Sequence, residues 1–136
     1  MQRGDAIVLR YGYMDLVRTI HLNAVHPQTL VPSLAGHSVG RWDGNVLEVD
    51  TVGFAPGVLN PPIMNSEQLH VVERFTPVDK DTIRYEFTVE DPTTWTAPWS
   101  GEMEIRRTGD PIYEYACHEG NLGLANILRA LQLSRK

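Results

Sequence analysis

Short stretches of alternating apolar and polar residues recur along this 136-residue chain, with turn residues between them. The clearest turn is Asp43-Gly44, a dipeptide typical of two-residue hairpins, which lies between two such stretches at 38–42 and 46–52. The same pattern is found at 6–11, 16–22, 69–75, 82–90, 99–107 and 112–118. Short strands at this spacing are typical of a β-sandwich or a β-barrel.

The strands pair off into four hairpins in series, and antiparallel neighbours are the default for short connections. Eight strands are enough to close a barrel that holds one small ligand. The sequence therefore predicts a mainly β fold. We expect about eight strands over 6–118, in an antiparallel meander closed into a calycin-like or lipocalin-like barrel.

The C-terminal part has a helical period instead. Its apolar residues Leu124, Ile127, Leu128 and Leu131 are spaced as one face of a helix. Asn121 suits the N-cap position, so we expect one α-helix over about 121–133. This helix would pack on the barrel wall or plug one end. The chain length fits a single domain over 1–136.

Three connections are long and rich in proline, at 23–37, 55–66 and 91–98. Long loops of this kind are often functional, so we expect them to form the rim of a pocket. Trp95 lies in the last of them and Trp42 ends a predicted strand. Both are candidates for ligand contact, and Trp95 with Trp99 beside the same loop could contact an apolar group or a sugar ring, although core or rim packing is the simpler explanation of these tryptophans.

The charge pattern narrows the classes of partner. The net charge is −5 and lysine and arginine do not cluster, which argues against nucleic acid and against anionic membranes. No apolar run reaches the length of a membrane span. We expect a small organic ligand or substrate as partner, with a homodimer as a possible assembly. The sequence leaves the compartment open: we expect a cytoplasmic one for the chain as written, and a periplasmic or secreted one if the chain belongs to an exported precursor.

Two charged residues interrupt the apolar faces of predicted strands. On one predicted strand Glu73 shares a face with Leu69, Val71 and Phe75. On another, Arg18 shares a face with Leu16, Ile20 and Leu22. A carboxylate in such surroundings resists ionisation unless it is paired, and a buried guanidinium must be paired. The two residues either form a structural ion pair inside the barrel or face a substrate, as acid or base and as anion holder.

Other polar residues could join such a site. The hydroxyls of Tyr85 and Tyr115 could orient a ligand oxygen. At the expected junction of strand and helix, His118 and Glu119 could do acid–base work, or Glu119 could cap the helix.

Two further histidines, His37 and His70, are candidates for the mouth of the cavity. Together with His118 and Glu119 they could bind a metal, but their spacing matches no metal-binding motif, so we expect no metal site. The single cysteine excludes an internal disulfide and a two-cysteine metal site. We expect no other cofactor either.

Three stretches carry a resemblance. They are Gly36-His37-Ser38-Val39-Gly40-Arg41-Trp42-Asp43-Gly44 continuing to Val49-Asp50-Thr51-Val52-Gly53-Phe54, then Ser66-Glu67-Gln68-Leu69-His70-Val71-Val72-Glu73-Arg74-Phe75, and Tyr113-Glu114-Tyr115-Ala116-Cys117-His118-Glu119-Gly120-Asn121. Over about 16–125 the chain resembles a widespread family of uncharacterised bacterial proteins. Members often carry an export signal and extra N-terminal sequence. The resemblance implies no activity and assigns no catalytic residue.

Two functions fit these features. The first is a small-molecule enzyme that uses acid–base chemistry in the barrel cavity without a cofactor, of lyase, isomerase or hydrolase type. Glu73 and Arg18 would be its central residues. The alternative is a lipocalin-like protein that binds a small apolar or amphiphilic ligand without chemistry, in which the same pair is a structural strut.

Overall fold

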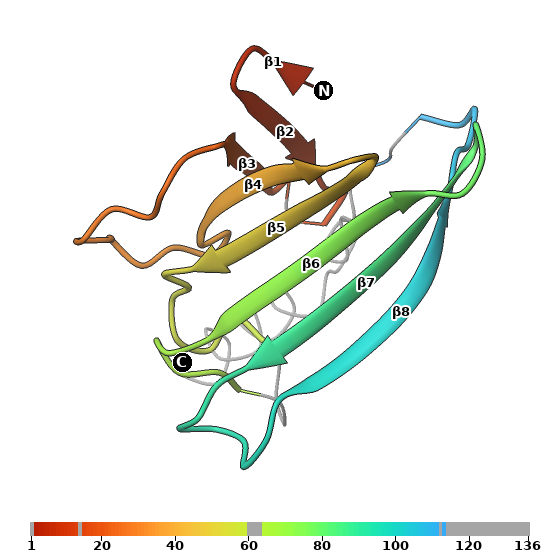
Figure 1. Cartoon of the computed structure of the whole chain (residues 1–136). Helices are drawn as coiled ribbons and strands as arrows, with labels where there is room; N and C mark the ends of the chain where they lie inside the picture. The colour runs from red at the N-terminus through yellow and green to blue at the C-terminus, as the bar shows by residue number, and fades with distance from the viewer. Residues whose placement is uncertain (1, 14, 60–63, 112, 114–136) are drawn as a thin grey trace, which may run out of the picture.

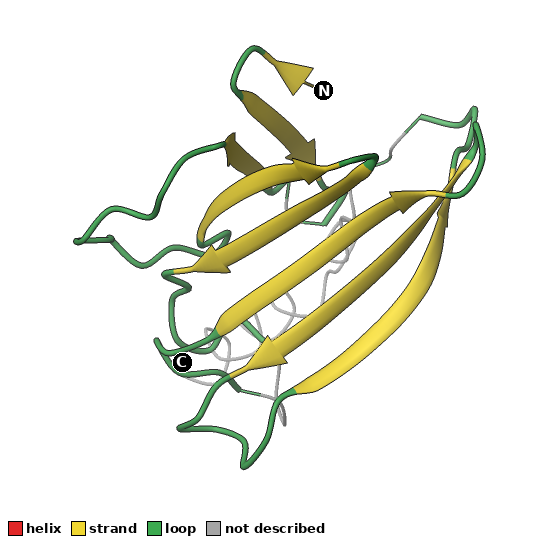
Figure 2. Ribbon diagram, in the orientation of Figure 1, coloured by secondary structure: helices red, strands yellow, loops and turns green. Residues whose placement is uncertain are grey.

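The structure is a computed structural model that describes residues 2–13, 15–59, 64–111 and 113. Its strands form one sheet in the order of the sequence (Figure 1). They are β1 (Gln2–Arg3), β2 (Ala6–Arg10), β3 (Val17–Leu22), β4 (His37–Asp43), β5 (Val46–Val52), β6 (His70–Pro77), β7 (Thr82–Glu90) and β8 (Trp99–Arg106). The described residues contain strands and loops but no helix (Figure 2).

Three of the four predicted hairpins are confirmed: β2–β3, β4–β5 and β6–β7 are antiparallel neighbours. In the β4–β5 turn, Gly44 has a φ of 60°, which the first central residue of a two-residue hairpin turn requires. Asp43 consequently pairs with Val46. The fourth hairpin needs the predicted strand 112–118, which apart from Tyr113 lies outside the described residues, and the predicted helix 121–133 lies wholly outside them.

One pairing contradicts the antiparallel meander. β3 and β4 are parallel neighbours, with Ile20 opposite Ser38 and Leu22 opposite Gly40. The reason is the long connection at 23–36, which returns the chain to the other end of the sheet before β4 begins. A parallel pair needs a connection of about a dozen residues or more, and the short hairpin turns elsewhere cannot supply it.

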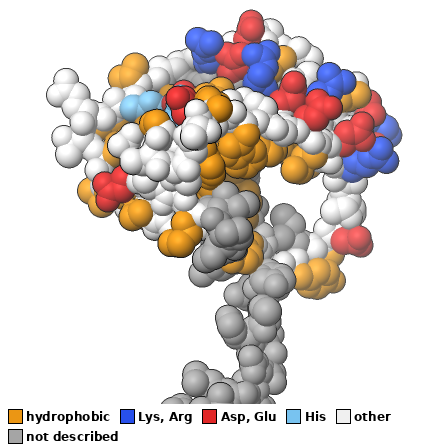
Figure 3. Space-filling view, turned by 90° about the horizontal axis from the view of Figure 1, so that it is seen from below, with side chains coloured by type: hydrophobic (Ala, Val, Ile, Leu, Met, Phe, Trp, Pro, Cys, Tyr) orange, Lys and Arg blue, Asp and Glu red, His pale blue; other side chains and the backbone are white. Residues whose placement is uncertain are grey.

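The sheet curls without closing among its described strands. β8 pairs with β7 and β1 pairs with β2, but no described pairing joins β8 to β1. The observed architecture is therefore a half-barrel, where the sequence predicted a closed barrel. Figure 3 shows the arch from below, with charged side chains along its outer surface and hydrophobic ones toward its inner side.

The concave face holds the core, as alternation predicted. Ile20, Leu47 and Val49 are buried there, and Ile7, Leu9, Leu22 and Phe75 pack against them. Burial of these apolar side chains is the main stabilising contribution. Glycines relieve crowding on this face, since a Cβ on Gly40 would lie 2.7 Å from Ile20 and one on Gly101 would lie 2.6 Å from the Phe87 ring.

The proline-rich loops gather at one end of the sheet. Ser33 forms a bridge with Phe54, and this joins the 23–36 connection to the chain after β5. The buried carboxylate of Asp91 accepts hydrogen bonds from the Ser66 amide at 2.6 Å and from the Ser66 and Thr93 hydroxyls at 2.8 and 3.0 Å. The loop after β7 is thereby fixed to the segment before β6.

Candidate functional site

Arg18 on β3 is the centre of a polar network on the concave face. Its guanidinium is paired with both carboxylate oxygens of Glu73 on β6, with Nη1 donating to Oε1 at 3.0 Å. Nε donates to the Ser38 hydroxyl at 2.7 Å, and Nη2 donates to the Thr51 hydroxyl at 2.8 Å. The network therefore joins four strands, β3 to β6, across the inside of the sheet.

The network leaves the two charges little contact with solvent. Arg18 is 8% exposed and Glu73 is 3% exposed. The Tyr85 hydroxyl on β7 donates to Glu73 Oε1 at 2.8 Å. No buried side-chain polar atom of the described residues lacks a hydrogen-bond partner. Such complete pairing is what makes buried charges tolerable in a protein interior.

The electrostatics agree with a fixed ion pair. Burial lowers the pKa of Arg18, but the hydrogen bonds and the negative charge of Glu73 outweigh it, so the net pKa of this guanidinium is raised. Burial and then the charge of Glu73 raise the pKa of Tyr85. At neutral pH the tyrosine is a neutral donor and the arginine is charged.

An apolar cavity of about 190 Å³ lies beside this network on the same face. Residues from six neighbouring strands, β2 to β7, line the cavity because the sheet curls around it. The described lining residues are all apolar: Ile7, Leu9, Ile20, Trp42, Leu47, Phe75, Pro77 and Ile83. Trp42 is about half exposed. The cavity lies toward the β4–β5 and β6–β7 turns, at the opposite end from the proline-rich loops.

The convex face carries a second polar cluster, built from histidines around Asp50 of β5. Asp50 Oδ1 lies 2.9 Å from His26 Nε2, and Asp50 Oδ2 lies 2.8 Å from His70 Nε2. The second ring nitrogen of His26, Nδ1, lies 2.9 Å from His37 Nδ1. The His21 ring is stacked on His37 at a centroid distance of 5.1 Å.

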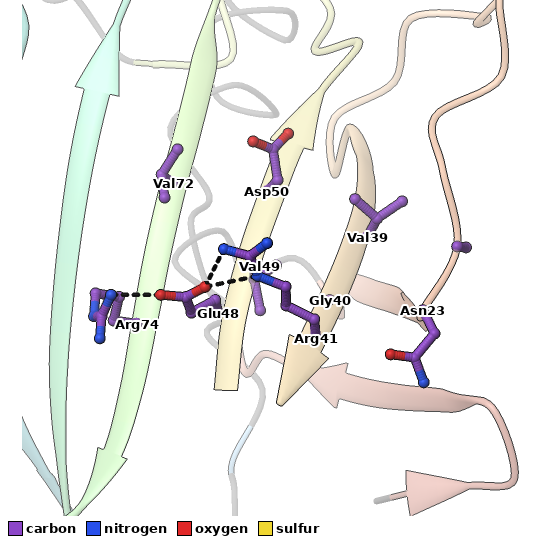
Figure 4. Close-up of a pocket in the computed structure, with 10 residues that line it drawn as sticks. Asn23, Val39, Gly40, Arg41, Glu48, Val49, Asp50, Val72 and Arg74 are labelled. Carbon is purple, nitrogen blue, oxygen red and sulfur yellow. Dashed lines mark hydrogen bonds and ion pairs between the residues drawn. The ribbon is translucent and has the colours of Figure 1, made fainter. Parts of the chain in front are cut away.

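Two shallow grooves lie on this convex face. One of about 540 Å³ runs from Asn23 and Ala24 past Asp50 to the ion-paired Arg41, Glu48 and Arg74 (Figure 4). Another of about 400 Å³ crosses β6 to β8. The charged groups at one end of the larger groove are already paired with one another, as the dashed lines of Figure 4 show.

The structure brings some of the sequence-predicted site residues together and separates others. Glu73, Arg18 and Tyr85 meet, and Trp42 lines the cavity next to them. His37 and His70 are on the opposite face of the sheet. Trp95 stacks edge-on against Trp99, away from the cavity lining.

Three predicted site residues, Tyr115, His118 and Glu119, lie outside the described residues. The sequence reasoning missed Ser38 and Thr51, although the alternation of β4 and β5 places these hydroxyls on the apolar face and could have revealed them. It also missed His26 and Asp50. His26 comes from an irregular loop, so no periodicity indicated its position.

Comparisons with protein-family models, with curated proteins and with solved structures gave no match for this chain. Within residues 2–113, apart from the undescribed positions, no group of three His, Cys, Asp or Glu side chains is arranged to hold a metal ion. The same part of the chain has no apolar helix long enough to cross a membrane. The family resemblance and the predicted partners stay predictions.

Proposed function

We propose that this protein binds a small apolar molecule, or the apolar part of an amphiphile, in the concave cavity of its curled sheet. The observation that carries the proposal is the wholly apolar lining of the cavity beside a polar network with no unpaired buried atom. A water molecule that enters an apolar cavity gains little free energy, because it finds no hydrogen-bond partners there. Apolar ligands gain free energy by leaving water for such a site.

The volume of the cavity limits the size of the ligand. Whole drug-sized ligands occupy sites of roughly 300–1,000 Å³. A cavity of about 150 Å³ is known to hold one benzene molecule in another protein. The cavity of about 190 Å³ therefore suits a single ring or a short alkyl chain. A polar head group would remain outside, near the half-exposed Trp42.

The position of Glu73 favours binding over catalysis. Both of its oxygens accept from Arg18, one also accepts from Tyr85, and neither Glu73 nor Arg18 lines the cavity or the two grooves. A general acid or base must reach its substrate. The pair is better placed as a strut that holds four strands in register beside the cavity. The acid–base enzyme stays a prediction, which a substrate screen of the Glu73→Gln variant addresses.

The binding proposal is tested by filling the cavity. Ile83→Phe adds a ring to the lining, so it should weaken toluene binding by about tenfold or more in calorimetric titration, since the ring occupies the site. The matched control is Ile105→Phe. Ile105 is opposite Ile83 on β8 and is similarly exposed, at 43% against 37%, but does not line the cavity.

The control should bind toluene as the wild type does. Equal affinity in all three proteins would contradict the site, and so would the absence of measurable toluene binding to the wild type. Circular dichroism of each variant confirms that the sheet is retained.

We also propose that the chain after β8 completes the barrel, with the strand 112–118 and the helix 121–133 that the sequence predicts. Support comes from β8, where Met103 and Ile105 expose apolar side chains on the concave face. Leu128→Asp in the helical stripe should then lower the free energy of unfolding. Ala130→Asp, off the stripe, should leave it nearly unchanged, and equal effects would contradict the helix.

A further inference from the structure

Two cross-strand rows of side chains line the large groove on the convex face. The middle residue of each row belongs to β5, and the flanking residues belong to β4 and β6. The acidic row is Val39, Asp50 and Val72, and the basic row is Arg41, Glu48 and Arg74. The rows are two residues apart along β5, and therefore roughly 7 Å from each other. Figure 4 shows the Asp50 carboxylate separated along β5 from Glu48 and its two arginines.

The two rows carry opposite net charges. In the basic row two guanidinium groups are paired with one carboxylate, which leaves a net charge of +1. In the acidic row Asp50 stands between two valines, which leaves a net charge of −1. His26 and His70 contact Asp50 from outside the row, and as neutral rings they donate N–H groups without cancelling its charge. Burial raises the pKa of Asp50, but the hydrogen bonds from His70 and His26 outweigh it and lower the net pKa, so the carboxylate is ionised.

Each row keeps the capacity to bind a ligand. The Asp50 side chain is 41% exposed, and each of its oxygens accepts one hydrogen bond, where a carboxylate has about four acceptor positions in all. Nη1 of Arg41 and Nη2 of Arg74 have no hydrogen-bond partner among the described residues. These two side chains are 75% and 46% exposed, whereas that of Glu48 is 17% exposed. A ligand in the groove therefore meets the guanidinium groups before the Glu48 carboxylate.

The charges of the groove determine which ligands suit it. An anionic ligand that extends beyond the basic row meets Asp50, and a cationic ligand that extends beyond the acidic row meets the guanidinium groups, so each is repelled at one end. A ligand with one positive and one negative group is attracted at both ends. Because Val39 and Val72 flank Asp50, the part of the ligand beside its positive group contacts aliphatic side chains.

We propose that the convex groove binds a small zwitterion in which a short apolar chain joins an ammonium group to a carboxylate. The ammonium lies at Asp50 between the two valines, and the carboxylate lies across Arg41 and Arg74. An ω-amino acid of about six carbon atoms has the required length, since its charged groups are about 7 Å apart when it is extended. This site is on the opposite face from the apolar cavity, so it is independent of the proposed ligand binding.

The test is a methyl NMR titration of the full chain with 6-aminohexanoate at low ionic strength and about pH 7.5, where imidazole is mostly neutral. We expect shifts at the methyls of Val39 and Val72 and none at Ile83 in the apolar cavity. The dissociation constant should be about 1 mM, because so small a ligand makes few contacts to offset its lost freedom. Hexanoate and hexylamine each lack one charged group, so each should bind this groove at least about fivefold more weakly.

Arg41→Gln and Arg106→Gln are a matched pair of variants. Both arginines have 75% exposed side chains and pair with a glutamate, but Arg106 of β8 does not line the groove. Arg41→Gln reduces the net charge of the basic row to zero, so it should weaken 6-aminohexanoate binding by about threefold to fivefold, the effect of one exposed charge contact. Arg106→Gln should bind the zwitterion as the wild type does. Both positions are exposed, so each variant should keep the fold.

Three results would overturn the proposal. The first is the absence of shifts at Val39 and Val72 when 6-aminohexanoate reaches tens of millimolar. The second is binding of hexanoate or hexylamine in this groove as tight as that of the zwitterion, which would show that one charged row is sufficient. The third is equal affinity for the zwitterion in Arg41→Gln and Arg106→Gln.

Discussion

The two faces of this sheet each carry a charged network, and they differ in what their charges can do. On the concave face, Arg18 and Glu73 are almost fully buried, and hydroxyls complete their hydrogen bonds. On the convex face, Asp50 and its histidines are partly exposed, with relative side-chain exposures of 24% to 41% for the ion-paired groups. The charged groups of the inner network are shielded from solvent, whereas those of the outer network are in contact with it.

The residue types explain this difference. A guanidinium keeps its charge at any pH at which the protein folds, so the inner network is fixed. Imidazole changes its charge near neutral pH, so the outer cluster can respond to its environment. A buried charge is therefore not by itself an indication of catalysis. We propose that the buried pair in this protein is a structural strut and that the neighbouring apolar cavity is the functional site.

Breaking the inner network should give the largest effect. Arg18→Met leaves the buried carboxylate of Glu73 without its cation, which typically lowers the free energy of unfolding by about 3–5 kcal/mol. Arg41→Met removes the exposed partner of Glu48 on the convex face and should leave stability nearly unchanged. Urea denaturation measures both. Equal losses of unfolding free energy in the two variants would contradict the proposed difference between the buried network and the exposed one.

A smaller effect is expected at Asp91, a buried carboxylate that is held by hydrogen bonds without a cation. Asp91→Asn replaces an acceptor with a donor that faces Ser66 and Thr93, at a cost of about 2 kcal/mol. Burial raises the pKa of Asp91, but the hydrogen bonds outweigh it and lower the pKa to about 2. Its contribution is therefore complete above about pH 4 and is lost as the pH falls toward 2.

The measurement is the difference in unfolding free energy between wild type and Asp91→Asn at several pH values. The difference should be constant from about pH 5 upward and should shrink in acid, because protonation removes the advantage of the carboxylate. A difference that grows on acidification would contradict this assignment.

Much of the sheet could be predicted from the sequence because strand alternation is local. The inner position of Glu73 and Arg18 followed from their apolar neighbours at i±2, and the Asp43-Gly44 turn fixed one hairpin. The parallel β3–β4 pairing could not be predicted, because a long connection allows either direction. The position of His26 was also hidden, since it depends on the path of an irregular loop.

The site was predicted only in part for the same reason. Alternation shows which side chains share a face, but it does not show whether they meet one another or a ligand. Only the distances show that Glu73 is fully engaged by Arg18 and Tyr85. His37 and His70 were expected at a mouth of the cavity, yet strand parity places them on the outside with Asp50.

The most direct test of the account is a methyl NMR titration of the wild-type protein with toluene. If the concave face is the binding face, shifts should be confined to methyls that line the cavity, such as Ile20, Leu47 and Ile83, while Val39 and Val72 in the convex groove stay unchanged. Shifts at Val39 and Val72 with none in the cavity, or no shifts on either face, would contradict it.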